Sequence, residues 1–187
     1  MTDLTKPKLS VERLEKLNHA DVIDLCDATV AAIEKDGGFG WVSVPERDVL
    51  ERYWKGVLAV PLRDLFVARL DGAIAGTVQL VRFPPNNQAQ SFSGQLTTFF
   101  VAPWARGHGL SERLIDLLED RAAEQGLNVI NLDVRETQLA AIKIFKRKGY
   151  TQWGMNPYYA LINERLVPGY FFHKLIKPLS SVTPIET

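Results

Sequence analysis

A nearly continuous apolar strand that runs into a glycine-bearing turn and then into an amphipathic helix constrains this fold more than any other feature. The unit spans Gln95 to Glu119. The apolar end of the strand is typical of a strand covered on both faces. After the turn, Leu114, Leu117 and Leu118 recur at helical spacing and predict a helix over about 110–125. Such a strand–turn–helix unit indicates a protein in which helices pack on a sheet.

The turn itself predicts an anion site. Gly107 and Gly109 let the backbone bend without a Cβ penalty and let another group approach closely. The helix that follows begins with N–H groups that have no intrahelical partner, at the positive end of its dipole. Arg106 adds a full charge, so the turn suits a phosphate or pyrophosphate. The alternative is an ordinary strand-to-helix turn, and a triphosphate loop is excluded because no Gly-Lys-Ser/Thr follows.

The remaining pattern predicts helices and strands in alternating groups. Asn18 is a candidate N-cap for the first helix, and Asp71-Gly72 is a strong hairpin signal. The expected helices are 18–37, 45–61, 110–125 and 137–149, and the expected strands are 64–70, 73–83, 91–101, 129–134, 150–162 and 167–176, while 8–16 is either an edge strand or the start of a helix. This order predicts a mixed sheet with helices on both faces. We expect one domain over residues 1–187, with loose ends at 1–7 and 178–187.

Composition narrows the class of protein. Lys plus Arg and Asp plus Glu both number 22, so net charge gives no support for nucleic-acid binding. Cys26 is the lone cysteine, which excludes an intrachain disulfide and favours a buried small side chain. The N-terminus lacks the apolar core of a secretory signal, no apolar run approaches membrane-spanning length, and no metal-ligand spacing occurs. We therefore expect a cytoplasmic protein without membrane, nucleic-acid or metal partners.

Two motifs carry a family resemblance. Val101-x-Pro103-x-x-Arg106-Gly107-x-Gly109-Leu110 resembles the coenzyme A motif of the GCN5-related N-acetyltransferases, the GNAT superfamily, which reads Arg/Gln-x-x-Gly-x-Gly/Ala and here ends on Ser111. Gln138-x-x-Ala141-Ile142-x-Ile144-Phe145-x-x-x-Gly149-Tyr150 resembles the second motif, Asn-x-x-Ala-x-x-Leu-Tyr-x-x-x-Gly-Phe. Both come in the family's order and spacing, and the resemblance covers roughly residues 60–176. A weaker likeness to tabtoxin-resistance-type GNAT enzymes lies in 76–81 and 84–88.

The resemblance implies both a fold and a co-substrate. The fold would be α/β (α+β), with a mixed, mostly antiparallel central sheet, helices on both faces and a splay between two neighbouring strands. Acetyl-CoA would lie in that splay, with its pantetheine arm on the peptide groups of Phe99, Phe100 and Val101. The resemblance assigns its pyrophosphate to the turn residues Arg106, Gly107, His108, Gly109, Leu110 and Ser111, and it adds Gln138 of the second motif to the coenzyme-binding positions.

The two positions that usually handle protons in this superfamily are altered. Gln95 stands where a Glu or Asp often acts as base, and Phe145 stands where a Tyr often acts as acid. Asp133 near the end of its strand is the best remaining base, although it could instead cap the following turn. Tyr158 and Tyr159 are candidate acids, with packing on the sheet as the alternative for each, and Tyr159 is our choice. Catalysis by positioning alone, or binding without turnover, also fits these replacements.

The resemblance favours an N-acetyltransferase that moves the acetyl group of acetyl-CoA to a primary amine of a small molecule. The amine would attack the thioester directly in a ternary complex, because no residue is set up as a covalent nucleophile. The alternatives are a non-catalytic acyl-CoA-binding sensor and a protein or peptide N-acetyltransferase. The resemblance also implies a possible homodimer, since many members pair through their terminal strands.

Overall fold

A computed structural model describes residues 6–36 and 39–178, and its strands form one seven-stranded sheet. The strands are β1 Leu9–Leu14, β2 Arg63–Leu70, β3 Ala73–Arg82, β4 Ser93–Val101, β5 Val129–Arg135, β6 Thr151–Ile162 and β7 Arg165–Leu175, in the spatial order β1-β2-β3-β4-β5-β7-β6. Every neighbouring pair is antiparallel except β4 and β5. The predicted mixed, mostly antiparallel sheet is therefore confirmed, and the open assignment of 8–16 resolves as a strand.

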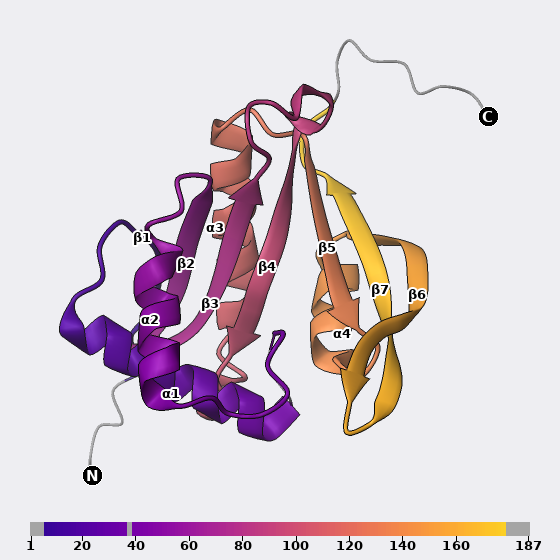
Figure 1. Ribbon diagram of the computed structural model, residues 1–187. Helices are drawn as coiled ribbons and strands as arrows, with labels where there is room; N and C mark the ends of the chain where they lie inside the picture. The colour runs from indigo at the N-terminus through magenta and orange to yellow at the C-terminus, as the bar shows by residue number, and fades with distance from the viewer. Residues whose placement is uncertain (1–5, 37–38, 179–187) are drawn as a thin grey trace.

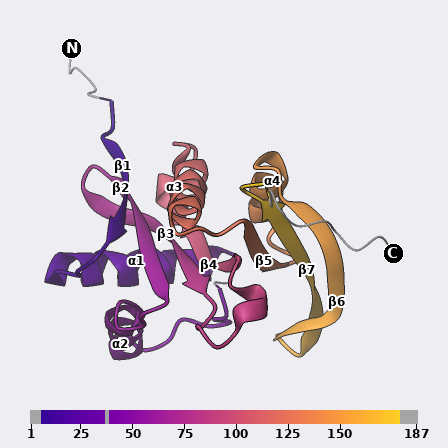
Figure 2. The ribbon, with the colours of Figure 1, turned by 90° about the horizontal axis from the view of Figure 1, so that it is seen from above.

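Within the described residues, four α-helices cover the two faces of the sheet. They are α1 His19–Asp36, α2 Arg47–Val57, α3 Leu110–Glu124 and α4 Leu139–Arg147. In Figures 1 and 2, α1 and α2 lie over one face of the β1–β4 half. The same views show α3 and α4 on the opposite face, with α4 behind β5 and β7. Among the described residues, no helix lies on the α1 side of β5, β7 and β6.

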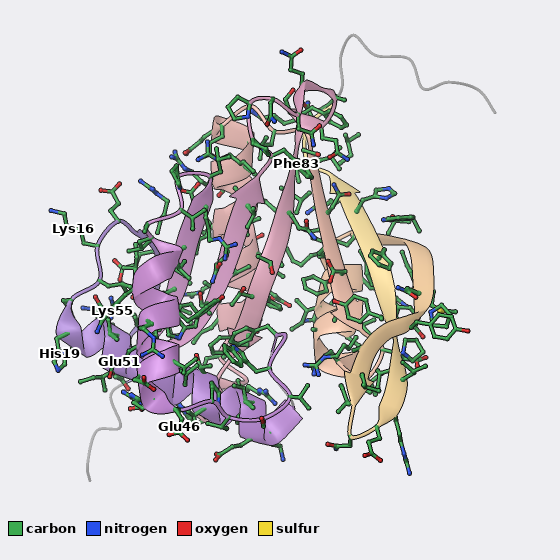
Figure 3. All side chains as sticks on the ribbon, in the orientation of Figure 1. Lys16, His19, Glu46, Glu51, Lys55 and Phe83 are labelled. Carbon is green, nitrogen blue, oxygen red and sulfur yellow. The ribbon has the colours of Figure 1, made fainter. Side chains whose placement is uncertain are left out.

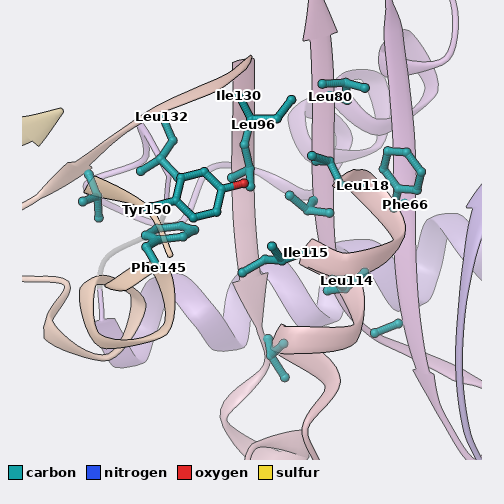
Figure 4. Close-up of a cluster of buried hydrophobic side chains, with 14 of the residues drawn as sticks. Phe66, Leu80, Leu96, Leu114, Ile115, Leu118, Ile130, Leu132, Phe145 and Tyr150 are labelled. Carbon is teal, nitrogen blue, oxygen red and sulfur yellow. The ribbon is translucent and has the colours of Figure 1, made fainter. Parts of the chain in front are cut away.

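Two apolar clusters fill the space between sheet and helices. The larger joins α3 and α4 to the sheet through residues such as Leu114, Ile115 and Phe145, and Figure 4 shows Phe145 beside Tyr150. The smaller lies under α1 and α2 and includes the fully buried Trp54. Cys26 belongs to this second cluster, as its expected role as a small buried side chain requires.

Local signals in the sequence explain several boundaries. Asn18 caps α1 as predicted, because its Oδ1 accepts from the Asp21 N–H at 2.9 Å while Asp21 Oδ2 accepts from the Asn18 N–H at 3.1 Å. The predicted stop of this helix at Gly37–Gly38 lies outside the described residues, as do the expected loose ends apart from 6–7 and 178. The second helix begins after its N-cap Glu46, slightly later than Pro45 suggested. Its outer face is polar, with Glu51 and Lys55 paired there (Figure 3).

The sheet splits between β4 and β5. Their parallel ladder contains only three residue pairs, from Ser93–Val129 to Gln95–Asn131. Beyond these pairs the strands diverge toward their carboxyl ends, as Figure 1 shows. The structure therefore contains the splay that the resemblance implied. Among the described helices, none has both the length and the apolar character needed to cross a membrane.

Candidate active site

A cavity of about 900 Å³ occupies the split between β4 and β5. One wall is β4 from Leu96 to Val101, and the other is the end of β5 with the N-terminal half of α4. The turn before α3 closes one end, and Tyr159 to Ile162 of β6 line another side. Phe39, Gly40 and Val42, from the segment between α1 and α2, complete the lining. The cavity is therefore lined by β4, β5, β6, α4 and the turn before α3.

The turn before α3 presents backbone donors to this cavity. Gly107 and Gly109 have φ angles of +85° and +72°, a region that residues with a Cβ rarely adopt. The N–H groups at the start of α3 have no intrahelical acceptor, because the first i−4 bond of this segment runs from Arg113 N–H to the Gly109 carbonyl. Arg106 Nε donates to the Val101 carbonyl at 3.2 Å, which ties the turn to the end of β4. This end of the cavity suits an anion.

Most of the predicted coenzyme-binding residues meet here. Phe99, Phe100, Val101, Arg106, Gly107, Gly109, Leu110, Ser111 and Gln138 all line the cavity. His108 does not; it lies exposed on the turn. Gln138 occupies the N-cap position of α4, which brings the second motif to the wall opposite the first.

A strained residue shapes the wall formed by β4. Thr98 has a φ of +51°, an outlier for a β-branched side chain, and it lies where the β3–β4 register slips between Thr77 and Gln79. Its hydroxyl lies 3.4 Å from the Tyr53 hydroxyl, which also accepts from Gln79 Nε2 at 3.3 Å. Strain of this kind persists only where neighbours hold it, and here a side chain of α2 and one of β3 do so. Such a bulge re-aims the peptide groups that follow it.

Asp133 lies just beyond the last β4–β5 pair, at the closed end of the split. Its Oδ1 accepts from Gln95 Nε2 at 2.9 Å, and its Oδ2 accepts from the Tyr159 hydroxyl. Both oxygens are therefore engaged by side chains of other strands, which differs from the cap of the following turn that we had weighed for this residue. The predicted base and the predicted acid are in direct contact, and the Gln that replaces the usual base holds the carboxylate in place.

An irregularity in β6 brings Tyr159 to Asp133 across the intervening strand. The pairs Asn156–Gly169 and Ala160–Val167 enclose two more residues on β6 than on β7. Pro157, which cannot donate to a ladder, lies within this bulge. The Tyr159 ring lies directly over Gly169, where an added Cβ would come within 2.1 Å of the ring. A glycine at this position is therefore required for Tyr159 to reach β5.

The surroundings of Tyr159 keep its hydroxyl protonated. Burial raises the pKa of Tyr159 above its ordinary value, and the hydrogen bond to the Asp133 carboxylate raises it further. Burial also lowers the pKa of Arg135, the residue two positions after Asp133 on β5. Tyr158, the other candidate acid, is exposed on β6.

Phe145 takes no part in proton chemistry. It is buried, and its ring packs against Phe99, Tyr150 and Phe172 with centroid distances of 5.3, 5.7 and 6.4 Å. Phe145 belongs to the buried cluster that Figure 4 shows and also lines the cavity, so its replacement of the usual Tyr extends the apolar core to the cavity wall.

Three contributors to the site were not anticipated from the sequence. Gly169 is one, and the only local signal for it was Pro157 inside a predicted strand. Thr98 and its contact with Tyr53 is the second, and it depends on residues 45 positions apart. Arg135 is the third, and its signal was the period-two spacing that puts it on the same face as Asp133.

Comparison with known proteins agrees with this geometry. The model of the acetyltransferase (GNAT) family matches residues 28–150. An N-acetyltransferase from the hisH–hisA intergenic region of Azospirillum brasilense is 56% identical over 138 residues, which are 74% of this chain and 79% of that protein.

Solved structures share the fold at low sequence identity. The Salmonella typhimurium protein yncA, solved with its cofactor acetyl-CoA, has a TM-score of 0.74 at 14% identity over 92% of this chain and 96% of its own. RimL, a ribosomal L7/L12 α-N-protein acetyltransferase solved with coenzyme A, has a TM-score of 0.75 at 12% identity over 89% and 93%. The family model and the curated relative, together with the split sheet and the turn before α3, establish that this chain belongs to the acetyltransferase (GNAT) family and is an N-acetyltransferase.

Proposed function

We propose that this enzyme transfers the acetyl group of acetyl-CoA to the primary amine of a small molecule by direct attack in a ternary complex. The observation that carries the proposal is one cavity that joins the donor-rich turn before α3 to the Asp133–Tyr159 pair. A single ligand with an anionic group and a reactive end can contact both. The fold neighbour yncA was solved with acetyl-CoA, which supports the same donor here.

The lining fits each part of acetyl-CoA. The N–H groups of Leu110 and Ser111, with Arg106, suit the pyrophosphate. The edge of β4 from Phe99 to Val101 borders the split beyond the last pair with β5, so its peptide groups are available to the amides of the pantetheine arm. Apolar side chains of α4, such as Ile144, form a dry wall for the rest of the arm.

Asp133 and Tyr159 supply the proton transfers. Asp133 accepts the proton that an ammonium group must lose before its nitrogen can attack the thioester carbonyl. As the new C–N bond forms, the C–S bond breaks and the electron pair stays on sulfur. Tyr159 can pass its proton to the leaving thiolate and recover one from Asp133, with which it shares a hydrogen bond. The second proton of the attacking nitrogen goes to solvent.

The walls of the cavity favour a small acceptor. One side is formed by Phe39, Gly40 and Val42, and the other by Leu161 and Ile162. A protein acceptor would instead require an open groove. RimL, a fold neighbour, is by its name a protein acetyltransferase, so a peptide acceptor belongs in the test.

Titration calorimetry with acetyl-CoA, followed by an amine and peptide screen for free thiol, tests the proposal. We expect micromolar binding and thiol release with at least one small amine. Asp133→Asn should retain coenzyme binding and lose most of the turnover. Tight binding of acetyl-CoA with no free thiol in the presence of any tested acceptor would instead favour a non-catalytic acyl-CoA sensor. No binding of acetyl-CoA up to millimolar concentration would overturn its assignment as the acetyl donor.

We also propose that two copies associate through the outer edge of β6. Thr151–Ile162 contains no charged residue, and Trp153, Met155 and Tyr158 are 62, 56 and 74% exposed. Edge strands without charge are ready templates for pairing. Light scattering during size-exclusion chromatography measures the oligomeric state. Trp153→Lys should shift a dimer toward monomer. A wild-type protein that is monomeric at all concentrations would refute the association through β6.

A further inference from the structure

Asp133 is held from both sides of its strand by side chains of two other strands. Gln95 Nε2 of β4 donates to Asp133 Oδ1 at 2.9 Å, and the Tyr159 hydroxyl of β6 donates to Asp133 Oδ2. A carboxylate offers about four lone-pair sites on its two oxygens, so each oxygen keeps room for one further donor. The carboxylate is therefore fixed in place and still able to accept a proton.

Gln95 lies at the point where β4 and β5 part. Its pair with Asn131 is the last of the β4–β5 ladder, and Asp133 follows two positions later on the same face of β5. The Gln95 side chain thus bridges the two strands just beyond their last backbone pair. The cavity lining on β4 begins at Leu96, while Asp133 and Tyr159 both line the cavity. Gln95 therefore contacts the carboxylate from outside the cavity.

The amide of Gln95 suits this contact chemically. Its NH2 group can only donate, and a donor directed at a carboxylate favours the ionised form. A carboxyl group in the same place could donate only while it held a proton. Once ionised, it would repel the neighbouring carboxylate at this distance. The identity of the residue at position 95 therefore decides how Asp133 responds to pH.

The other charged and titratable groups around Asp133 come from three strands and one helix. Tyr159 of β6 touches it, Arg135 follows it on the same face of β5, and His173 of β7 lies one same-face position away from the residue opposite it. Tyr53 of α2 reaches β4 at its bulge. All four groups are retained when position 95 is changed, so a comparison of variants at this position isolates the effect of the amide.

We infer that Gln95 is a positioning residue for acetyl transfer: its amide holds the Asp133 carboxylate ionised and oriented toward the acceptor amine. This inference rests on the proposed function, in which Asp133 accepts the proton of that amine. A carboxylate that rotated freely would spend part of its time turned away from the amine, and the reactive geometry would be lost. The effect belongs to the chemical step, so kcat should change and coenzyme affinity should not.

Gln95→Leu removes the donor and keeps a similar side-chain volume. With thiol release as the assay, we expect kcat to fall by about 10- to 100-fold, the range for loss of a hydrogen bond to a charged group. The Kd for acetyl-CoA, measured by calorimetry, should stay unchanged. Gln125→Leu is the matched control, because Gln125 Nε2 also donates to an aspartate of another element, Asp64 Oδ2, at 2.8 Å. This control should lose stability but keep the wild-type kcat.

Gln95→Glu gives the sharper readout, because it keeps the shape of the side chain and makes the donor depend on pH. The introduced carboxyl group can donate to Asp133 only while it is protonated. The ratio of kcat in Gln95→Glu to kcat in the wild type should therefore be highest at about pH 5 and fall toward about pH 9. This ratio cancels the ionisation of the amine, which is the same for both enzymes. If position 95 could itself supply the base, the ratio would rise with pH instead.

The outcomes separate this inference from the proposed function. A ratio that rises with pH or stays constant, a wild-type kcat in Gln95→Leu, or an equal loss of kcat in Gln125→Leu would overturn the role of Gln95 and leave acetyl transfer standing. Full turnover by Asp133→Asn, or no thiol release with any amine, would remove the proposed function and this inference with it. Should Gln95→Leu fail to fold, the pH dependence of the isosteric Gln95→Glu decides.

Discussion

Replacing Gly169 by alanine is expected to displace the Tyr159 ring and so to break its contact with Asp133. A Cβ at this position would lie 2.1, 2.4 and 2.5 Å from three ring carbons, far inside ordinary contact distance. These atoms are Cγ and both Cδ atoms of Tyr159 on the neighbouring strand, so rotation of the outer part of the side chain cannot relieve the clash. Either the ring moves away from β7 or the two strands separate.

The magnitude follows from these two responses. If the ring stays, the overpacked site costs about 1–3 kcal/mol. If the ring leaves, the protein loses a hydrogen bond to a carboxylate, worth about 1.5–3 kcal/mol. The responses are alternatives and the protein adopts the less costly one, so the expected loss is about 1–3 kcal/mol and not their sum. For a chain of this size, each kcal/mol lowers Tm by about 2–4 °C. Displacing a catalytic group by about 1 Å can also cost about 100-fold in kcat/KM.

Differential scanning calorimetry and thiol release measure the two effects. Gly154→Ala is the matched control, because its Cβ would meet Phe171 at an ordinary 3.9 Å. The decisive variant is Tyr159→Ala/Gly169→Ala: with the ring gone, the added methyl should be neutral or stabilising by up to about 1 kcal/mol relative to Tyr159→Ala alone. If Gly169→Ala costs the same in both backgrounds, the steric link between Gly169 and Tyr159 is wrong.

The other predictions concern the turn, the base, the first helix and alkaline pH. Gly109→Asp should weaken acetyl-CoA binding at least 100-fold by calorimetry without unfolding the protein, whereas Gly72→Asp, at a hairpin of similar φ, should leave affinity unchanged. Asp133→Asn should lower kcat and flatten its pH profile; a normal profile would move the base elsewhere. Asn18→Ala should cost about 1 kcal/mol in denaturant unfolding, and no change would deny the cap its role. Because the folded-state pKa of Tyr159 is raised, its contribution to stability is present below its ordinary pKa of 10.0 and is lost as pH rises above that value. The stability difference between wild type and Tyr159→Phe should therefore shrink above pH 10, and a constant difference would contradict this.

Local chemistry explains what the sequence predicted well. The cap at Asn18, the hairpin at Asp71–Gly72 and the turn at Gly107 and Gly109 each depend on residues within a few positions of one another. Both hairpin residues adopt positive φ, 50° and 93°, as a tight Asp-Gly turn requires. Helix and strand limits followed from periodicity in the same way. The split between two strands came from the family resemblance and not from periodicity, which carries no information on strand order.

Distant pairs explain what the sequence left open. Asp133 could be named as a base, but its partners are 38 and 26 positions away, in Gln95 and Tyr159. Spacing alone could not distinguish Tyr159 from Tyr158, because the choice depends on a bulge that shifts the register of β6 by two residues. A smaller cavity of about 580 Å³ is lined by α1, β5 and the β6–β7 turn, and it exists only once these distant segments meet.

The sheet consists of two halves, β1–β4 and β5–β7–β6, and the ladder between β4 and β5 joins them through three pairs of residues. Hydrogen–deuterium exchange should therefore divide the strands at this point. Amides of β4 that face the split beyond Gln95 should exchange faster than those paired with β3, and a bound coenzyme should slow them by acting as the missing strand. A ligand that contacts both halves of the sheet also adds its binding free energy to the free energy of unfolding. The Tm should therefore rise with the logarithm of acetyl-CoA concentration. The concentration of acetyl-CoA would then determine how firmly the two halves of the sheet are held together.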